Sequence, residues 1–176
     1  MHPGVAAAIS GAAFWCLHQF TVSVFDWAEL NSNVHWVYLP SGVRLAATLL
    51  LGWPACLGIA LATLLTDWSA SASMAWGHAG VTALISGFSP LLARYWGSRW
   101  LDIPHDLSGL NSHSLVLLAG LFALISATLH QAWFWAAGWG THGVTPWLVM
   151  VMGDFTGALA VLLILGWLLM WWEKMR

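Results

Sequence analysis

Residues 146–172 read PWLVMVMGDFTGALAVLLILGWLLMWW. A helix crosses the hydrocarbon core of a bilayer with about 20 apolar residues. This run is longer than that and holds a single charged side chain, Asp154. Pro146 suits the first turn of such a helix, because the N–H that proline lacks would have no helical partner there. The stretch therefore predicts a membrane-spanning helix with one carboxylate in its interior.

The composition of the whole chain is that of a membrane protein. Of its 176 residues, 60% are hydrophobic and 7% are charged, whereas about a quarter of the residues of a soluble domain are charged. This composition argues against a soluble enzyme. Five Lys and Arg against seven Asp and Glu cannot form a phosphate-binding surface, so we expect no nucleic-acid partner. We expect a multi-pass protein of the bacterial inner membrane, in contact with membrane lipids.

Five further apolar stretches are candidates for membrane crossings, so we predict an all-α fold with six transmembrane helices in a single domain. The predicted spans cover residues 5–25, 34–51, 53–65, 78–96, 114–137 and 146–172. Pro40 and Gly42 are expected to break the second span near its start, and Pro90 is expected to kink the fourth. The third span ends before Asp67 and is short for a bilayer.

Basic residues predict the orientation of these spans. Arg94 and Arg99 follow the fourth span, and Lys174 and Arg176 follow the sixth. The loops on the other side contain no Lys or Arg. Because Lys and Arg concentrate on the cytoplasmic side, both termini are predicted to be cytoplasmic.

The chain contains fifteen Trp, a residue that prefers the membrane–water interface. Most of them fall near predicted span ends: Trp27, Trp36, Trp68, Trp76, Trp139 and Trp147 on the outer side, and Trp53, Trp96, Trp100, Trp171 and Trp172 on the inner side. This distribution indicates two anchoring belts, and an aromatic-lined ligand cavity is the alternative. Trp15 and Trp167 lie deeper and are expected to pack between helices.

The loop of residues 97–113 is predicted to lie on the cytoplasmic side. Its apolar residues recur at three- and four-residue steps, which is typical of a short interfacial helix. Asp102, His105 and Asp106 would share its polar face. We interpret them as solvated side chains, with a metal site or a partner-docking surface as the alternative.

Four ionisable side chains and two neighbouring glutamines stand out inside the predicted spans, where ionisable groups are costly and mark functional sites. They are His18, Gln19, Arg44, His130, Gln131 and Asp154. With a rise of 1.5 Å per residue, the four ionisable ones fall at roughly 10–15 Å from the outer surface. We therefore predict that they meet in the outer half of the membrane, near its midplane, and form a ligand-binding site.

Arg44 and Asp154 are the charges that lie deepest in the spans. Each alone would cost about 3 kcal/mol or more at the bilayer centre, so we expect them to pair. The pair could be a salt bridge that locks the second span to the sixth, or Arg44 could engage an anionic ligand or lipid head group with Asp154 orienting it. Gly153 and Gly157 flank Asp154 at GxxxG spacing, which permits close approach of a neighbouring helix.

His18 and His130 belong to a repeated tripeptide. Leu17–Gln19 recurs as Leu129–Gln131, and Trp27 and Trp139 share the offset of 112 residues. This repeated pattern suggests that the first two spans are structurally equivalent to the last two. The two histidines are interpreted as core residues bonded to each other or to glutamine. We expect no cofactor; the alternative is haem, held by the two imidazoles.

Two segments resemble the MASE1 membrane sensor domain. The first is Trp36–Ala46, WVYLPSGVRLA, continuing to Gly58, and the second is Met152–Leu159, MGDFTGAL. The resemblance implies a sensory membrane module, with Pro40, Gly42, Gly153 and Gly157 as motif positions. The chain departs from the family in having fewer spans, in ending at Arg176 without an effector domain, and in lacking the proline after the Gly-Asp helix. A stand-alone module of this kind would signal through a separate membrane or cytoplasmic protein.

We find no catalytic motif and expect a non-enzymatic protein without a metal centre. The leading hypothesis is a MASE1-like sensory or ligand-binding module. A substrate-binding subunit of a small-molecule transporter is the first alternative, because the size and span number are similar to those of energy-coupling-factor transporter subunits. An accessory or haem-holding subunit of a larger membrane complex is the second.

Overall fold

The computed structural model describes residues 1–25, 27, 29–31, 34–70, 76–100, 111–139 and 143–175. These residues form six helices: α1 Pro3–Val24, α2 Pro40–Leu51, α3 Trp53–Ala70, α4 Trp76–Trp100, α5 Ser112–Ala137 and α6 Val144–Met175. Two short strands, β1 Glu29–Asn31 and β2 Val34–His35, pair in antiparallel fashion between α1 and α2. The predicted all-α class is confirmed. Asp102, His105 and Asp106 lie outside the described residues.

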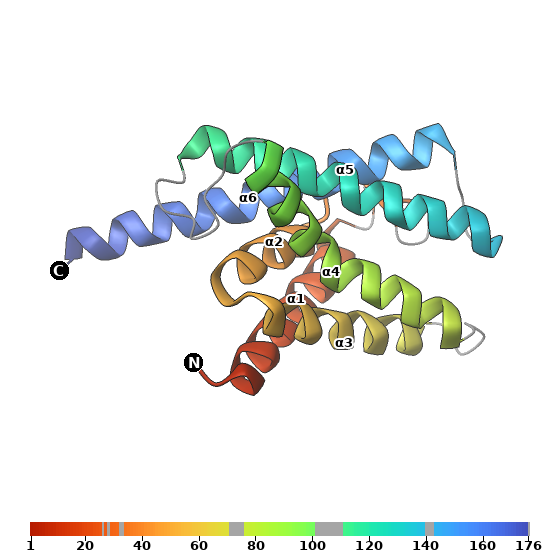
Figure 1. The fold of residues 1–176 in the computed structure, drawn as a ribbon, viewed down its shortest axis with the longest axis horizontal. Helices are drawn as coiled ribbons and strands as arrows, with labels where there is room; N and C mark the ends of the chain where they lie inside the picture. The colour runs from red at the N-terminus through yellow and green to blue at the C-terminus, as the bar shows by residue number, and fades with distance from the viewer. Residues whose placement is uncertain are drawn as a thin grey trace.

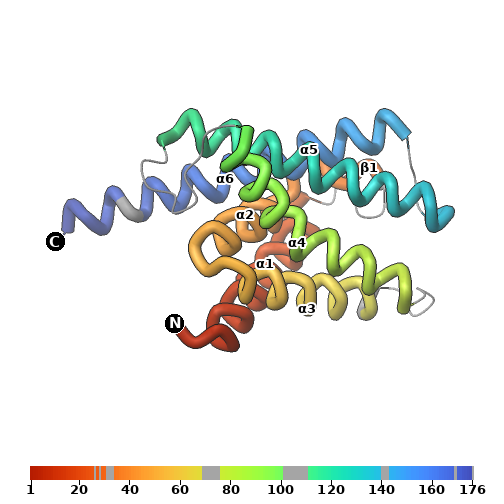
Figure 2. The backbone as a smooth tube through the Cα atoms, in the orientation of Figure 1, coloured from red at the N-terminus to blue at the C-terminus, as the bar shows by residue number. Residues whose placement is uncertain are grey.

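Helix α2 is the centre of the bundle. In chain order α3 packs on α1, α4 on α3, α5 on α4 and α6 on α5, while α2 contacts α1, α3, α4 and α6. Figure 1 shows this arrangement, with the first turn of α1 and the last turn of α6 at the left and the last turn of α5 and the first turn of α6 at the right. The tube in Figure 2 shows how short α2 is beside the helices that surround it.

The prediction of a helical span that begins at residue 34 is wrong. Residues 34–39 are not helical, and Pro40 begins α2 rather than breaking it. Proline is favourable there because the first-turn N–H has no intrahelical partner. The helix ends at Gly52, whose φ of 70° and ψ of −147° favour glycine, and α3 follows directly. At twelve residues, α2 is about 18 Å long.

Three helices, α1, α5 and α6, are long and apolar enough to cross a membrane. Helix α2 is shorter, and α3 and α4 carry inward-facing polar side chains such as Thr63, Thr82 and Ser86. Helix α3 runs to Ala70, so Asp67 lies inside a helix and not in the predicted loop. The apolar core lies where Leu45 meets Phe122, Leu118 and Ala158, all of them fully buried.

The expectation that Trp15 and Trp167 pack between helices is wrong. Their exposed fractions are 49% and 61%, and both rings lie on the outer surface of the bundle. Depth along a helix does not determine which face a side chain occupies. An apolar surrounding such as lipid accepts an indole ring as readily as a neighbouring helix does.

Candidate functional site

Arg44 projects from the central helix into the middle of the bundle, where its side chain is buried. Its Nε donates to the carbonyl oxygen of Ser86 at 2.8 Å. Its Nη2 donates to the hydroxyls of Ser89 at 2.7 Å and Ser126 at 3.1 Å. The guanidinium also lies over the Phe122 ring, 5.1 Å from the ring centre. Arg44 therefore joins α2 to α4 and α5.

Pro90 explains why the Ser86 carbonyl is free to accept this bond. In a regular helix the carbonyl of residue 86 would accept from the N–H of residue 90, but proline has none. Helix α4 nevertheless continues through Pro90, which is fully buried. Arg44 thus supplies the donor that the helix itself lacks. A backbone carbonyl that is freed in this way and kept from water requires another hydrogen-bond partner.

Asp154 on α6 is the ionic partner of Arg44, as predicted. Arg44 Nη1 lies 3.7 Å from Asp154 Oδ1, and the two side chains are 3% and 4% exposed. This separation is longer than a hydrogen bond. Ser126 lies closer to the guanidinium, because its hydroxyl accepts from Arg44 Nη2 at 3.1 Å. The guanidinium and the carboxylate therefore face each other without a direct, bidentate hydrogen bond.

Gly153 and Gly157 provide the close approach that their spacing predicted, but to a different element. A Cβ at Gly153 would meet the carbonyl oxygen of His35, and a Cβ at Gly157 would meet that of Tyr38. Both carbonyls belong to the non-helical segment before α2. Tyr38 N–H donates to the Gly153 carbonyl at 3.2 Å, and Ser41 Oγ donates to the Asp154 carbonyl at 2.7 Å. The glycines therefore let the entry into α2 lie directly on α6, which fixes Arg44 beside Asp154.

His130 is buried and engaged at both ring nitrogens. Its Nδ1 lies 2.8 Å from the Ser126 carbonyl oxygen, and its Nε2 lies 3.2 Å from Ser86 Oγ. Because a carbonyl only accepts, Nδ1 carries the proton and Nε2 accepts from the serine hydroxyl. An imidazole held in this way has no nitrogen left for iron, so the residues do not fit the haem alternative.

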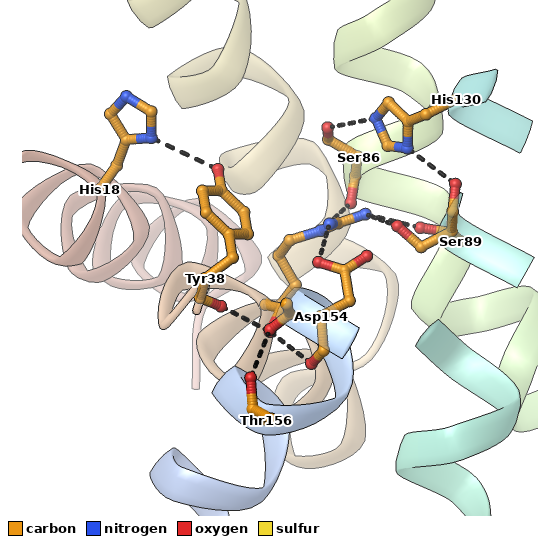
Figure 3. Close-up of polar contacts among 11 residues, drawn as sticks. His18, Tyr38, Ser86, Ser89, His130, Asp154 and Thr156 are labelled. Atoms are coloured by element: carbon orange, nitrogen blue, oxygen red, sulfur yellow. Dashed lines mark hydrogen bonds and ion pairs between the residues drawn. The ribbon is translucent and has the colours of Figure 1, made fainter. Parts of the chain in front are cut away.

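His18 lies across the site from His130, on α1. Its Nδ1 is 3.3 Å from the Tyr38 hydroxyl, and Figure 3 shows its ring pointing toward that group. The two histidines therefore bond to tyrosine and serine and not to each other or to glutamine. Gln19 is exposed, and Gln131 is buried outside the cavity described next. Neighbouring residues on a helix point about 100° apart, so a His-Gln pair cannot face one site.

A polar cavity of about 60 Å³ lies among these groups. Arg44, Asp154, His18 and His130 all line it, so the predicted meeting of the four ionisable side chains is found. Figure 3 shows Ser86, His130 and Asp154 converging on this interior. One water needs roughly 10–15 Å³ by this kind of measure, so the space admits a few waters or one small polar molecule.

Sequence reasoning missed much of the cavity lining. The polar residues it did not single out are His35, Tyr38, Thr63, Thr66, Asp67, Thr82 and Ser86. Most of them lie on two helical stripes, with Thr63, Thr66 and Asp67 on α3 and Thr82 and Ser86 on α4. Steps of three and four residues place side chains on one helix face, so these stripes were readable in the sequence. The aromatic residues at the cavity are Phe and Tyr, with no Trp among the lining residues that the structure describes.

Comparison with known proteins gives no relative for this chain: no family model, no curated protein and no solved structure matches it.

Proposed function

We propose that this chain is a non-enzymatic integral membrane module that binds a small polar molecule in its interior cavity and acts through a separate protein, as a MASE1-like sensory protein would. One observation carries the proposal. Arg44 and Asp154, the buried ion pair, border a cavity between the helices instead of closing on each other. Buried charges are usually compensated fully by their neighbours, so a polar space beside them supports binding of a polar guest.

The chemistry of the lining supports a binding role over a catalytic one. Hydroxyls, imidazoles and a guanidinium surround the space, and several are already fixed by hydrogen bonds to the protein. The Ser86 hydroxyl is directed to His130 while the Ser86 carbonyl is occupied by Arg44. Groups held in this way can recognise a ligand by position. The cavity volume favours a small guest over the vitamin-sized cargo of a transporter subunit.

In this proposal the chain crosses the bacterial inner membrane six times with both ends in the cytoplasm. The second crossing is made by the non-helical residues 34–39 and by α2. Irregular backbone at membrane depth is tolerated where protein buries it or where it lines a cavity. Here the segment before α2 lies on α6 and contributes Tyr38 to the cavity.

Native mass spectrometry of protein released gently from membranes tests the proposal. We expect the wild-type protein to carry a small adduct that Thr82→Leu lacks, because Thr82 is buried at the cavity and a leucine would fill it. Thr145→Leu is the matched control, since Thr145 is exposed on α6. Equal adducts in all three proteins, or none in the wild type, would contradict the proposal.

The same preparation tests the sensory role. We expect a signalling protein to co-purify with the wild-type chain. Co-purification of an ATPase-bearing subunit instead would support the transporter alternative and contradict a sensory module.

A further inference from the structure

The α3 side of the cavity holds two oxygen acceptors without partners. Thr63 Oγ1 and Asp67 Oδ2 are buried, and neither has a hydrogen-bond partner in the part of the chain that the structure describes. Thr63 is only 6% exposed, and both residues line the cavity. They are four positions apart on α3, which places them on one face of the helix. Buried acceptors are nearly always paired, so this pair calls for a donor.

The charges around the cavity are also unbalanced. Arg44 faces Asp154 and three oxygen acceptors on α4 and α5. Asp67 is a second carboxylate at the same cavity, and no salt bridge involves it among the described residues. With the histidines neutral and both carboxyls ionised, the lining sums to one negative charge. A buried negative charge is stabilised by a positive partner, and an anionic guest would meet two carboxylates.

We infer that the guest of this cavity is a small protonated amine, with ammonium ion as its smallest member, whose N–H groups donate to Asp67 Oδ2 and Thr63 Oγ1. This inference rests on the proposed function and names the chemical class of its ligand. The volume of about 60 Å³ sets an upper limit on the size of the amine. The rings of Phe14 and Tyr38 border the same space, and aromatic faces attract cations.

A hydrogen-bonding cation fits better than a metal ion. No group of three or more His, Cys, Asp and Glu side chains that could hold a metal occurs among the described residues. Ca²⁺ takes about six to eight oxygen ligands, whereas each N–H donor of an amine needs a single acceptor. Thr63 and Asp67 offer such acceptors, and the ring nitrogen of a neutral histidine is another.

Thermal unfolding of the purified protein in detergent provides the test. A ligand that binds only the folded state raises the unfolding temperature in a saturable way. Ammonium chloride, methylammonium chloride, sodium chloride and tetramethylammonium chloride are compared at equal ionic strength. We expect a saturable rise with ammonium or methylammonium and none with sodium or tetramethylammonium, which cannot donate N–H bonds. The two amine arms distinguish the free ion from an organic amine.

Variants locate the effect at the two acceptors. We expect Asp67→Asn and Thr63→Val each to raise the apparent Kd for the better amine by about tenfold or more, the loss of one hydrogen bond to a charged group. Glu173→Gln, at an exposed carboxylate near the end of α6, is the matched control and keeps the wild-type Kd. Thr63→Val keeps the shape of the side chain and serves as the test should Asp67→Asn fail to fold.

The outcome separates this inference from the proposed function. A saturable rise with sodium equal to that with the amines would overturn the inference, as would an unchanged Kd in both acceptor variants. If Thr82→Leu removes a native adduct but neither amine raises the unfolding temperature, the binding module stands and the amine is wrong.

Discussion

Arg44 Nε donates a 2.8 Å hydrogen bond to the carbonyl oxygen of Ser86, the carbonyl that Pro90 leaves without its helical donor. The bond links α2 to the turn of α4 in which Pro90 interrupts the helical hydrogen bonding. It also orients the guanidinium so that Nη2 reaches Ser89 and Ser126 while Nη1 faces Asp154. A proline in a helix interior costs about 3 kcal/mol, and here the group that it exposes positions the only buried cation of the described bundle.

Pro90→Ala is expected to loosen Arg44. The alanine brings an N–H that competes with Arg44 Nε for the Ser86 carbonyl, so the Nε–H of Arg44 should exchange with water at least about tenfold faster, the effect of roughly 1.4 kcal/mol. The chain has four arginines, and Arg44→Lys assigns the signal in nitrogen-resolved NMR spectra. Pro54→Ala is the control, because Pro54 lies in the first turn of α3. Unchanged exchange in Pro90→Ala would contradict this role of the proline.

The two glycines of α6 give a second prediction. Gly153→Ala and Gly157→Ala are each expected to lower the free energy of unfolding by roughly 1–3 kcal/mol, because the added methyl meets backbone carbonyls that cannot move independently. Gly166→Ala on the same helix has open space around its Cα and should be neutral or slightly stabilising. Denaturation in mild detergent measures all three. Equal effects at the three positions would mean that α2 does not enter along α6.

Ser86→Ala tests the fixed state of His130. Removal of the hydroxyl leaves His130 Nε2 buried without its donor, which should cost about 1–3 kcal/mol of unfolding free energy. The bond from Arg44 goes to the Ser86 backbone and is retained. Ser98→Ala, at a partly exposed serine of the same helix whose hydroxyl donates to the Tyr95 carbonyl, should change stability by less than about 0.5 kcal/mol. A shift of the His130 ring signals in Ser98→Ala equal to that in Ser86→Ala would contradict the assignment.

The sequence predicted the helices well because composition and length determine them in a membrane setting. It also predicted that Arg44 and Asp154 meet, because the cost of two isolated charges leaves few other arrangements. The entry into α2 was missed, since apolar residues at 34–39 satisfy a helix and an extended segment equally well. Only the contact of this segment with Gly153 and Gly157 decides between the two.

The site was predicted in part for a related reason. His18 and His130 are predictable as site residues because their side chains are ionisable. Whether Gln19 faces the site depends on the rotation of α1 about its own axis. Periodicity fixes that rotation only when all the residues of a helix face are compared. The apolar run ends before Asp67, which favours a loop at this residue. Its position four residues after Thr63 was the signal that it continues a polar helix face toward the cavity.

The proposed six-span topology makes a separate prediction. Green fluorescent protein fused after Arg176 should fluoresce, because it folds in the cytoplasm, and alkaline phosphatase fused after Trp139 should be active, because that loop would lie outside. Exchange of the two reporters should silence both. Active phosphatase after Arg176 would contradict the orientation that Arg94, Arg99 and Lys174 predict.

The buried pair itself allows a test in which folding and binding are separated. Arg44→Met and Asp154→Leu singly leave an uncompensated charge and should each cost about 3–5 kcal/mol of unfolding free energy. The double variant replaces both charges by apolar side chains of similar size, and such replacements are often tolerated. We expect it to be more stable than either single variant.

The most direct measurement is therefore the native mass spectrum of the folded Arg44→Met/Asp154→Leu protein beside that of the wild type. If the pair is the electrostatic centre of a binding cavity, the double variant remains folded and loses the small adduct that the wild type carries. A folded double variant that retains the adduct at wild-type occupancy would mean that Arg44 and Asp154 only hold α2 to α6.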